Sequence, residues 1–256
     1  MLAAVALAAV VASPWTFAVL VIGAGVIVAW EWGRLVRGTE FDSIAWVQAV
    51  TVAAIVISVT LKRPEFAALA FLVALAIIGF LSRASSHLAW SIAGMAYAGL
   101  PAFALVWLRS DKTLGAAALL YLLAVAWTTD STSYAAGRLI GGPKLAPAIS
   151  PRKTWAGLIV GTIAPALIGY AGALLLYGTS GTRLALVSMV IAAACQVGDL
   201  SESAVKRTFG AKDMSHLIPG HGGLVDRIDG LLFAALAAAL IALRDPANPG
   251  RGLLIW

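Results

Sequence analysis

The sequence predicts an all-α, polytopic integral membrane protein with about nine transmembrane helices. Hydrophobic residues make up 61% of the 256 residues and charged residues only 12%, whereas charged residues form about a quarter of an ordinary soluble domain. Apolar runs long enough to cross a bilayer recur along the chain. The composition excludes a soluble domain and a disordered chain, and the single cysteine, Cys195, excludes an intrachain disulfide.

Nine segments approach the roughly 20 mainly apolar residues that a transmembrane helix needs. The first is too short to span alone, so either it continues through Ser13 and Pro14 or the count is eight. We expect one membrane-embedded domain over 1–256, with N-terminal helices in 1–128 and a catalytic half in 129–243. The segments are Leu2–Val11, Trp15–Leu35, Ile44–Leu61, Phe66–Leu81, Leu88–Leu108, Leu114–Thr128, Trp155–Tyr177, Leu184–Val197 and Gly230–Leu243.

The basic residues indicate an orientation in the membrane. The net charge of +6 comes with no Lys/Arg block, so we expect anionic membrane lipids and no nucleic acid as partners. Loops that follow even-numbered segments hold eleven Lys and Arg, and the loops on the other side hold seven. The positive-inside rule then places the N-terminus and the even-numbered loops in the cytoplasm, which suits a bacterial inner membrane protein.

Two long polar segments, 129–154 and 198–229, carry 14 of the 30 charges on 58 residues. Both follow even-numbered apolar segments, so both are expected at the cytoplasmic face, where they can meet. The sequence therefore predicts that the chemistry takes place in these two segments.

In the later segment, a helix that continues past Asp199 would place Glu202, Ser203 and Lys206 on the same face. The alternative is that Asp199 and Glu202 only form salt bridges with Lys206 at the membrane interface. Glycines at 220, 222 and 223 then allow a sharp turn that can approach a ligand closely. Asp226 and Asp229 follow, either as ligands or as acids that stabilise the first turn of a helix.

Carboxylates and cations around a glycine turn are the groups that bind a nucleoside triphosphate with a divalent cation. Magnesium suits them, because it binds through one or two carboxylates plus substrate phosphates. The spacing fits neither a Walker A motif nor a kinase glycine loop.

In the earlier segment, Asp130 ends an apolar helix, where an ionisable group indicates function. Ser150, Arg152, Lys153 and Thr154 precede the next helix, at a place typical of phosphate binding. These basic residues are interpreted equally well as a positive-inside anchor. Glu31, within the second apolar segment, either extends to Arg34 or lines a path for lipid.

The polar residues from 203 to 229 resemble the signature of the phosphatidate cytidylyltransferase (CDP-diacylglycerol synthase) family. The residues that carry this resemblance are Ser203, Lys206-Arg207, Lys212-Asp213, His221-Gly222-Gly223, Asp226-Arg227 and Asp229. Further matches are Gly198-Asp199 with Glu202, Asp130 with Tyr134 and Gly137-Arg138, and Ser150-Pro151 with Lys153-Thr154. The N-terminal half matches only as a pattern of spans, with Trp30-Glu31-Trp32 as a landmark. One departure is Ala156, where many members have Glu, so that a carboxylate is absent here.

The resemblance implies transfer of a cytidylyl group from CTP to phosphatidic acid, giving CDP-diacylglycerol and pyrophosphate. It implies Mg²⁺ as cofactor, with room for a second cation, and a homodimer. The implied catalytic residues are Asp226, Asp199, Lys206 and Arg227. The implied metal ligands are Asp199 and Asp226, and after them Asp130, Glu202 and Asp229. The implied substrate-binding residues are Ser150, Arg152, Lys153, Thr154, Ser203, Arg207, Lys212, His221, Gly222 and Gly223.

Two alternatives remain open. In the first, CTP is kept but the acceptor changes: CTP-dependent lipid kinases of dolichol or phytol and archaeal CDP-archaeol synthases are similar multi-pass proteins. The kinases transfer the γ-phosphoryl group and release CDP. A transporter of anionic metabolites would place polar residues or helix breaks near the membrane midplane, whereas the charges of this chain gather in two segments on one predicted side.

Overall fold

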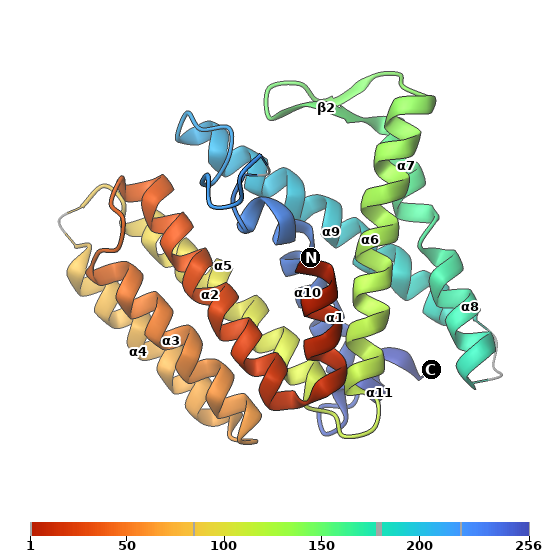
Figure 1. The fold of residues 1–256 in the computed structure, drawn as a ribbon, viewed down its shortest axis with the longest axis horizontal. Helices are drawn as coiled ribbons and strands as arrows, with labels where there is room; N and C mark the ends of the chain where they lie inside the picture. The colour runs from red at the N-terminus through yellow and green to blue at the C-terminus, as the bar shows by residue number, and fades with distance from the viewer. Residues whose placement is uncertain (1, 84, 178–180, 221, 256) are drawn as a thin grey trace. The chain divides into compact units, whose positions relative to one another are not determined.

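The computed structural model describes residues 2–83, 85–177, 181–220 and 222–255 (Figure 1). The N-terminal helices are α1 (Leu2–Ala12), α2 (Pro14–Arg37), α3 (Ser43–Thr60), α4 (Pro64–Leu81) and α5 (Leu88–Arg109). The later helices are α6 (Gly115–Leu139), α7 (Trp155–Ile163), α8 (Ala166–Tyr177), α9 (Thr182–Thr208), α10 (Val225–Ala242) and α11 (Pro249–Leu254). Strands β1 (Lys144–Ala146) and β2 (Ser150–Thr154) form an antiparallel hairpin. The predicted all-α class is confirmed.

Six helical segments within the described residues are long and apolar enough to cross a membrane. These are α2, α3, α4, α5, the α7–α8 segment as far as Leu175, and α9. The multi-pass class of the chain is thus confirmed, whereas the predicted count of nine spans is not reached by this criterion.

The chain divides into two compact units. The first unit contains Met1–Ser110 and Phe209–Ile228, and the second contains Asp111–Thr208 and Asp229–Trp256. The segment 209–228, which carries most of the polar signature, therefore packs with the N-terminal helices. The predicted single domain, with its division near residue 128, stays a prediction.

In the first unit, α2 packs against α3 and α5, and α3 packs against α4 and α5 (Figure 1). Val28, Val52, Ile55 and Met95 are almost completely buried between these helices. Apolar side chains on facing helices therefore form the core of this unit.

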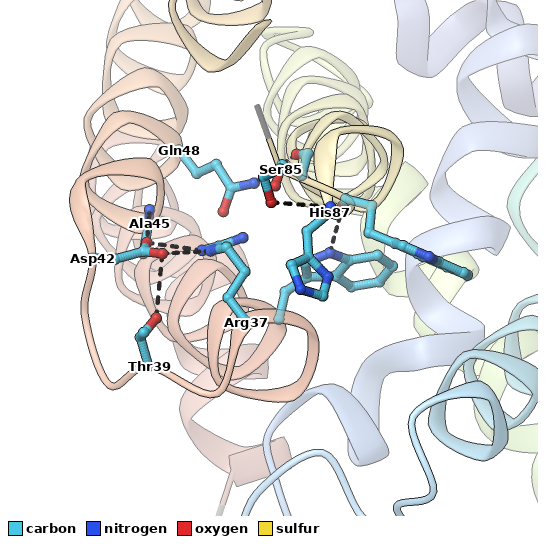
Figure 2. A network of polar contacts seen from close by, with 10 residues as sticks. Arg37, Thr39, Asp42, Ala45, Gln48, Ser85 and His87 are labelled. Carbon is cyan, nitrogen blue, oxygen red and sulfur yellow. Dashed lines mark hydrogen bonds and ion pairs between the residues drawn. The ribbon is translucent and has the colours of Figure 1, made fainter. Parts of the chain in front are cut away.

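A polar network joins the end of α2 to the start of α3 (Figure 2). Arg37 donates from Nε and Nη2 to the two carboxylate oxygens of Asp42, at 2.5 and 2.9 Å. Asp42 caps α3 by accepting from the backbone N–H of Ala45 at 2.8 Å, and the Thr39 hydroxyl donates to the same carboxylate at 3.2 Å. These bonds satisfy the first turn of α3 and fix the loop that precedes it.

In the second unit, α6 packs against α7, α8 and α9. The predicted helix 155–177 is two helices, α7 and α8, with Pro165 at the break because proline has no N–H to donate. Two predicted ends were too early: the sixth segment continues from Thr128 to Leu139, and the eighth from Val197 to Thr208. Asp130 therefore lies inside α6, and much of both predicted loops is helical.

Asp111 connects two helix starts in the second unit. Asp111 is only 4% exposed, and its Oδ1 accepts from the Thr113 and Leu114 backbone N–H groups, each at 2.9 Å. Its Oδ2 accepts from the backbone N–H of Arg251 in α11 at 3.1 Å. Burial acts to raise the pKa of Asp111, but the hydrogen bonds to Leu114, Thr113 and Arg251 outweigh it and hold the pKa below its ordinary value.

Replacing Asp111 with Asn should lower the free energy of unfolding by about 2 kcal/mol, because buried N–H groups lose a charged acceptor. Since the pKa is lower in the folded state, the Asp111 carboxylate stabilises the fold above the ordinary carboxyl pKa. That stabilisation is lost as the pH falls through the folded-state pKa. Thermal unfolding in detergent across this range should show a smaller acid-induced loss for Asp111→Asn than for wild type; parallel curves would contradict this assignment.

Candidate active site

Three carboxylates from three helices of the second unit lie near one lysine. Asp130 is on α6, Asp199 on α9 and Asp229 on α10, and Lys153 is on β2. Nζ of Lys153 lies 2.5 Å from Oδ2 of Asp199. Asp130 and Asp229 both interact electrostatically with Asp199 and Lys153. We call these four residues the acidic cluster.

Two glycines let α10 approach α9 closely enough to place Asp229 in this cluster. A Cβ atom added at Gly198 would lie 2.7 Å from the backbone oxygen of Asp229, and one added at Gly230 would lie 2.6 Å from Sγ of Cys195. Either contact is too short for packed atoms, so these positions exclude larger side chains. Cys195 is buried, as expected for a small apolar residue, and its Sγ lies 4.0 Å from Oδ1 of Asp130.

The acidic cluster suits a cation that shares its ligands with a substrate. Within the described ranges, no group of three or more His, Cys, Asp or Glu side chains is arranged to hold a metal ion by itself. The cluster nevertheless sets three carboxylates against one ammonium group, and its donors are oxygens. These donors fit Mg²⁺, which commonly completes its coordination with phosphate oxygens and water.

The continuation of α9 past Asp199 confirms the predicted helical face. Glu202 pairs with Lys206 one turn later at 2.7 Å, and their side chains are 2% and 12% exposed. Glu202 therefore forms the expected salt bridge with Lys206, whereas Asp199 pairs with Lys153 instead, and the proposed role of Glu202 as a metal ligand stays a prediction. Ser203 lies on the same helix and is partly buried.

The hairpin β1–β2 places the predicted phosphate-binding residues Ser150, Arg152, Lys153 and Thr154 on one short strand. Arg152 is exposed and Lys153 reaches Asp199. Thr154 is buried, and its Oγ1 caps α7 by accepting from the backbone N–H of Gly157 at 3.1 Å. In the same unit, Nε of Arg207 donates to the backbone oxygen of Ile149 at 3.2 Å.

In the first unit, Asp226 closes the segment 209–224 onto the start of α10. Its Oδ2 accepts from the backbone N–H of Met214 at 3.0 Å and from that of Gly223 at 2.7 Å. Gly222 has φ of +82°, a conformation that other residues adopt at a cost, so the turn needs glycine there. Lys212 and Arg227 are exposed, and His221 lies outside the described residues.

Glu31 is the residue whose role sequence reasoning missed. It is completely buried, and its carboxylate accepts from the Ser215 hydroxyl and from the backbone N–H groups of Leu224 and Val225. The interpretation in which Glu31 extends to Arg34 was wrong, since Arg34 pairs with Glu40 and Glu31 contacts the segment 209–224. The interpretation in which it lines a path for lipid stays a prediction. The available signal was an acid within an apolar segment, which is costly unless it has partners.

Comparison with known proteins shows the family of this chain. The model of the cytidylyltransferase family matches residues 1–243. The chain belongs to this family. A phosphatidate cytidylyltransferase of Brucella abortus biovar 1 (strain 9-941) is 40% identical over 222 residues, which cover 86% of this chain and 81% of the relative. A protein of the same name from Rickettsia typhi (strain ATCC VR-144 / Wilmington) is 32% identical over 194 residues, covering 73% of this chain and 85% of the relative. The family match covers both polar segments of the sequence. It therefore supports the resemblance that implied the candidate site residues in these segments.

Proposed function

We propose that this chain transfers the cytidylyl group of CTP to phosphatidic acid, releasing pyrophosphate and forming CDP-diacylglycerol. The observation that carries this proposal is the polar signature from Ser203 to Asp229, found within a chain whose cytidylyltransferase family match extends from residue 1 to 243. The named relatives at 40% and 32% identity support the same reaction.

The reaction requires that the negative charge of the phosphates is neutralised and that the reacting atoms are aligned. A phosphate oxygen of phosphatidic acid bonds to the α-phosphorus of CTP, and the bond from that phosphorus to the α–β bridging oxygen breaks. The attacking oxygen is already anionic, so neither a strong general base nor a covalent enzyme intermediate is required. Positively charged groups that hold the phosphates in line supply most of what is needed.

The exposed cations of the signature suit phosphate binding. Lys212 and Arg227 would bind the phosphates of CTP in the first unit, where both flank the turn at Gly222 and Gly223. Arg152 and Lys153 would bind phosphate in the second unit, while Asp199 holds the ammonium group of Lys153 in place. Lys206 and Arg207, at the end of α9, are further candidates.

Mg²⁺ is the proposed cofactor, held by Asp199 with Asp130 and Asp229 in the second unit. Asp226 is a further candidate ligand in the first unit. When bound, the ion would neutralise phosphate charge and orient the oxygens at phosphorus. When the ion is absent, Lys153 would limit the electrostatic repulsion among the three carboxylates of the acidic cluster.

The location and the assembly belong to the same proposal. The bias of eleven basic residues against seven supports a cytoplasmic location of the two polar segments, on the side where CTP is present. The bacterial relatives favour the inner membrane. A homodimer is implied by the resemblance, and the mass of the purified protein in detergent tests it.

Removal of divalent cations should abolish turnover, because the phosphates of CTP would face uncompensated carboxylates. Protein treated with a chelator and assayed with CTP and phosphatidic acid should release no pyrophosphate until Mg²⁺ is restored. CTP binding at equilibrium should weaken in the same preparation. Full turnover with an excess of chelator would contradict the magnesium assignment, and an unchanged melting temperature would show that the loss is not due to unfolding.

A further inference from the structure

Glu31 holds the segment 209–224 against the N-terminal helices, although the two are far apart in sequence. Its Oε1 accepts from the Ser215 hydroxyl at 2.5 Å and from the backbone N–H of Leu224 at 2.8 Å. Its Oε2 accepts from the backbone N–H of Val225 at 2.8 Å. All of these residues belong to the first unit. A single side chain of α2 thus binds this segment at Ser215, in its middle, and at its junction with α10.

This carboxylate occupies the N-terminus of α10. The first N–H groups of a helix have no partner within the helix, and their dipoles favour a negative charge. The Glu31 carboxylate therefore performs at long range what an N-cap residue performs locally. Among the described ion pairs of the chain, none includes Glu31, so its buried charge is balanced by these donors and the helix end.

Gly223 is the position that makes this contact possible. A Cβ atom at residue 223 would lie 2.4 Å from Oε1 of Glu31 and 2.8 Å from its Cδ. The backbone N–H of Gly223 donates to Asp226 at 2.7 Å, while the next two N–H groups donate to Glu31. Three successive N–H groups are therefore shared between two carboxylates, which fixes the turn from Gly222 into α10.

We infer that Glu31 is a positioning residue for nucleotide binding, acting through the segment 209–224 and the first turn of α10. The inference rests on the proposed function, because that segment carries Lys212 and the glycine turn, and α10 begins with Asp226 and Arg227. Glu31 itself is completely buried, and its carboxylate contacts the Ser215 hydroxyl and two backbone N–H groups. Loss of its charge should therefore weaken binding of CTP through misplaced neighbours.

The test is Glu31→Gln, which keeps the size of the side chain but removes its charge. An amide has one acceptor oxygen instead of two, so at least one N–H of Leu224 or Val225 faces a donor. We expect KM for CTP to rise about tenfold, which corresponds to one lost hydrogen bond to a charged group. We also expect faster hydrogen exchange at Leu224 and Val225, with unchanged exchange at Val52 in α3.

Two further variants keep the test decisive. Glu65→Gln makes the same chemical change at an exposed surface pair with Arg63 and should leave KM unchanged. Ser215→Ala removes the hydroxyl that donates to Glu31 and accepts from the Leu217 backbone N–H, but leaves the bonds of Glu31 to Leu224 and Val225. It should raise KM by a smaller factor, which provides the test if Glu31→Gln does not fold. A purely structural role would reduce the amount of active protein, and thus the apparent kcat, at constant KM.

An unchanged KM for CTP, or unchanged exchange at Leu224 and Val225, in folded Glu31→Gln would overturn the inference. Failure of the proposed function gives a different result, since wild-type protein would then release no pyrophosphate from CTP and phosphatidic acid. The exchange measurement needs no turnover. It therefore tests whether Glu31 orders the segment 209–224 even if the proposed function is wrong.

Discussion

Replacing Asp199 with Asn should lower kcat for CTP turnover about a thousandfold, the largest effect expected of any single substitution. Asp199 is the member of the acidic cluster that pairs with Lys153, at 2.5 Å, and it interacts with both Asp130 and Asp229. The amide would remove a proposed ligand of Mg²⁺ and would release the ammonium group of Lys153. Pyrophosphate release by purified protein, at several Mg²⁺ concentrations, measures the effect.

Asp245→Asn is the matched control, because Asp245 is an acid of the same unit outside the cluster. It should retain wild-type turnover. Lys153→Met and the double variant separate the two roles of Asp199. If Asp199 acts only by holding Lys153, the double variant is no worse than Lys153→Met; if it also binds the cation, the double variant is slower. Turnover within about threefold of wild type in Asp199→Asn would contradict the assignment.

Replacing Asp226 with Asn should lower turnover about a hundredfold or more while leaving membrane insertion intact. Oδ2 of Asp226 accepts from the N–H groups of Met214 and Gly223, so the charge both orders the segment 209–224 and serves as a proposed metal ligand. The amide oxygen can still accept these bonds, though more weakly than a carboxylate. Most of the expected loss is therefore the loss of charge.

Two measurements distinguish these roles of Asp226. Hydrogen exchange at Met214 and Gly223 reports on the order of the segment, and the Mg²⁺ concentration that gives half-maximal turnover reports on metal binding. We expect exchange to change little and the Mg²⁺ requirement to rise strongly. Near wild-type activity in purified Asp226→Asn would refute the metal assignment, and Glu65→Gln again provides the control at an exposed site.

Features that follow from local spacing could be predicted from the sequence. The helical face of Asp199, Glu202 and Lys206 depends on the helical repeat alone, and α9 confirms it. Asp226 lies in the first turn of α10, as one interpretation of the acids after the glycine turn expected, although the apolar segment was expected to begin only at Gly230. The signature residues could be assigned to the candidate site because their order and spacing along the chain are typical of the family.

Helix ends in polar sequence could not be predicted from hydropathy. The sixth segment was expected to stop at Thr128, but α6 continues to Leu139 because its polar side chains bond within the helix. Oγ1 of Thr129 donates to the backbone oxygen of Val125 at 2.8 Å, and that of Thr132 donates to the oxygen of Thr128 at 2.6 Å. The hairpin β1–β2 and the short α11 lacked any periodic signal and were not expected.

Long-range pairing was the part of the site beyond the reach of the sequence. Ser215 and Glu31 are 184 residues apart, and nothing in either neighbourhood indicates the other. The pairing of Asp199 with Lys153, rather than with Lys206, likewise depends on the position of β2 in the second unit. Chain order identified the chemical groups, but only the fold assigns their partners.

The central claim is cytidylyl transfer to phosphatidic acid, and the fate of the phosphates of CTP tests it most directly. Purified protein in detergent is supplied with phosphatidic acid, Mg²⁺ and CTP labelled in separate reactions at the α- or the γ-phosphate. Cytidylyl transfer predicts α-label in the extracted lipid and γ-label in pyrophosphate. Label from the γ-phosphate in the lipid, with release of CDP, would show a lipid kinase and contradict the account.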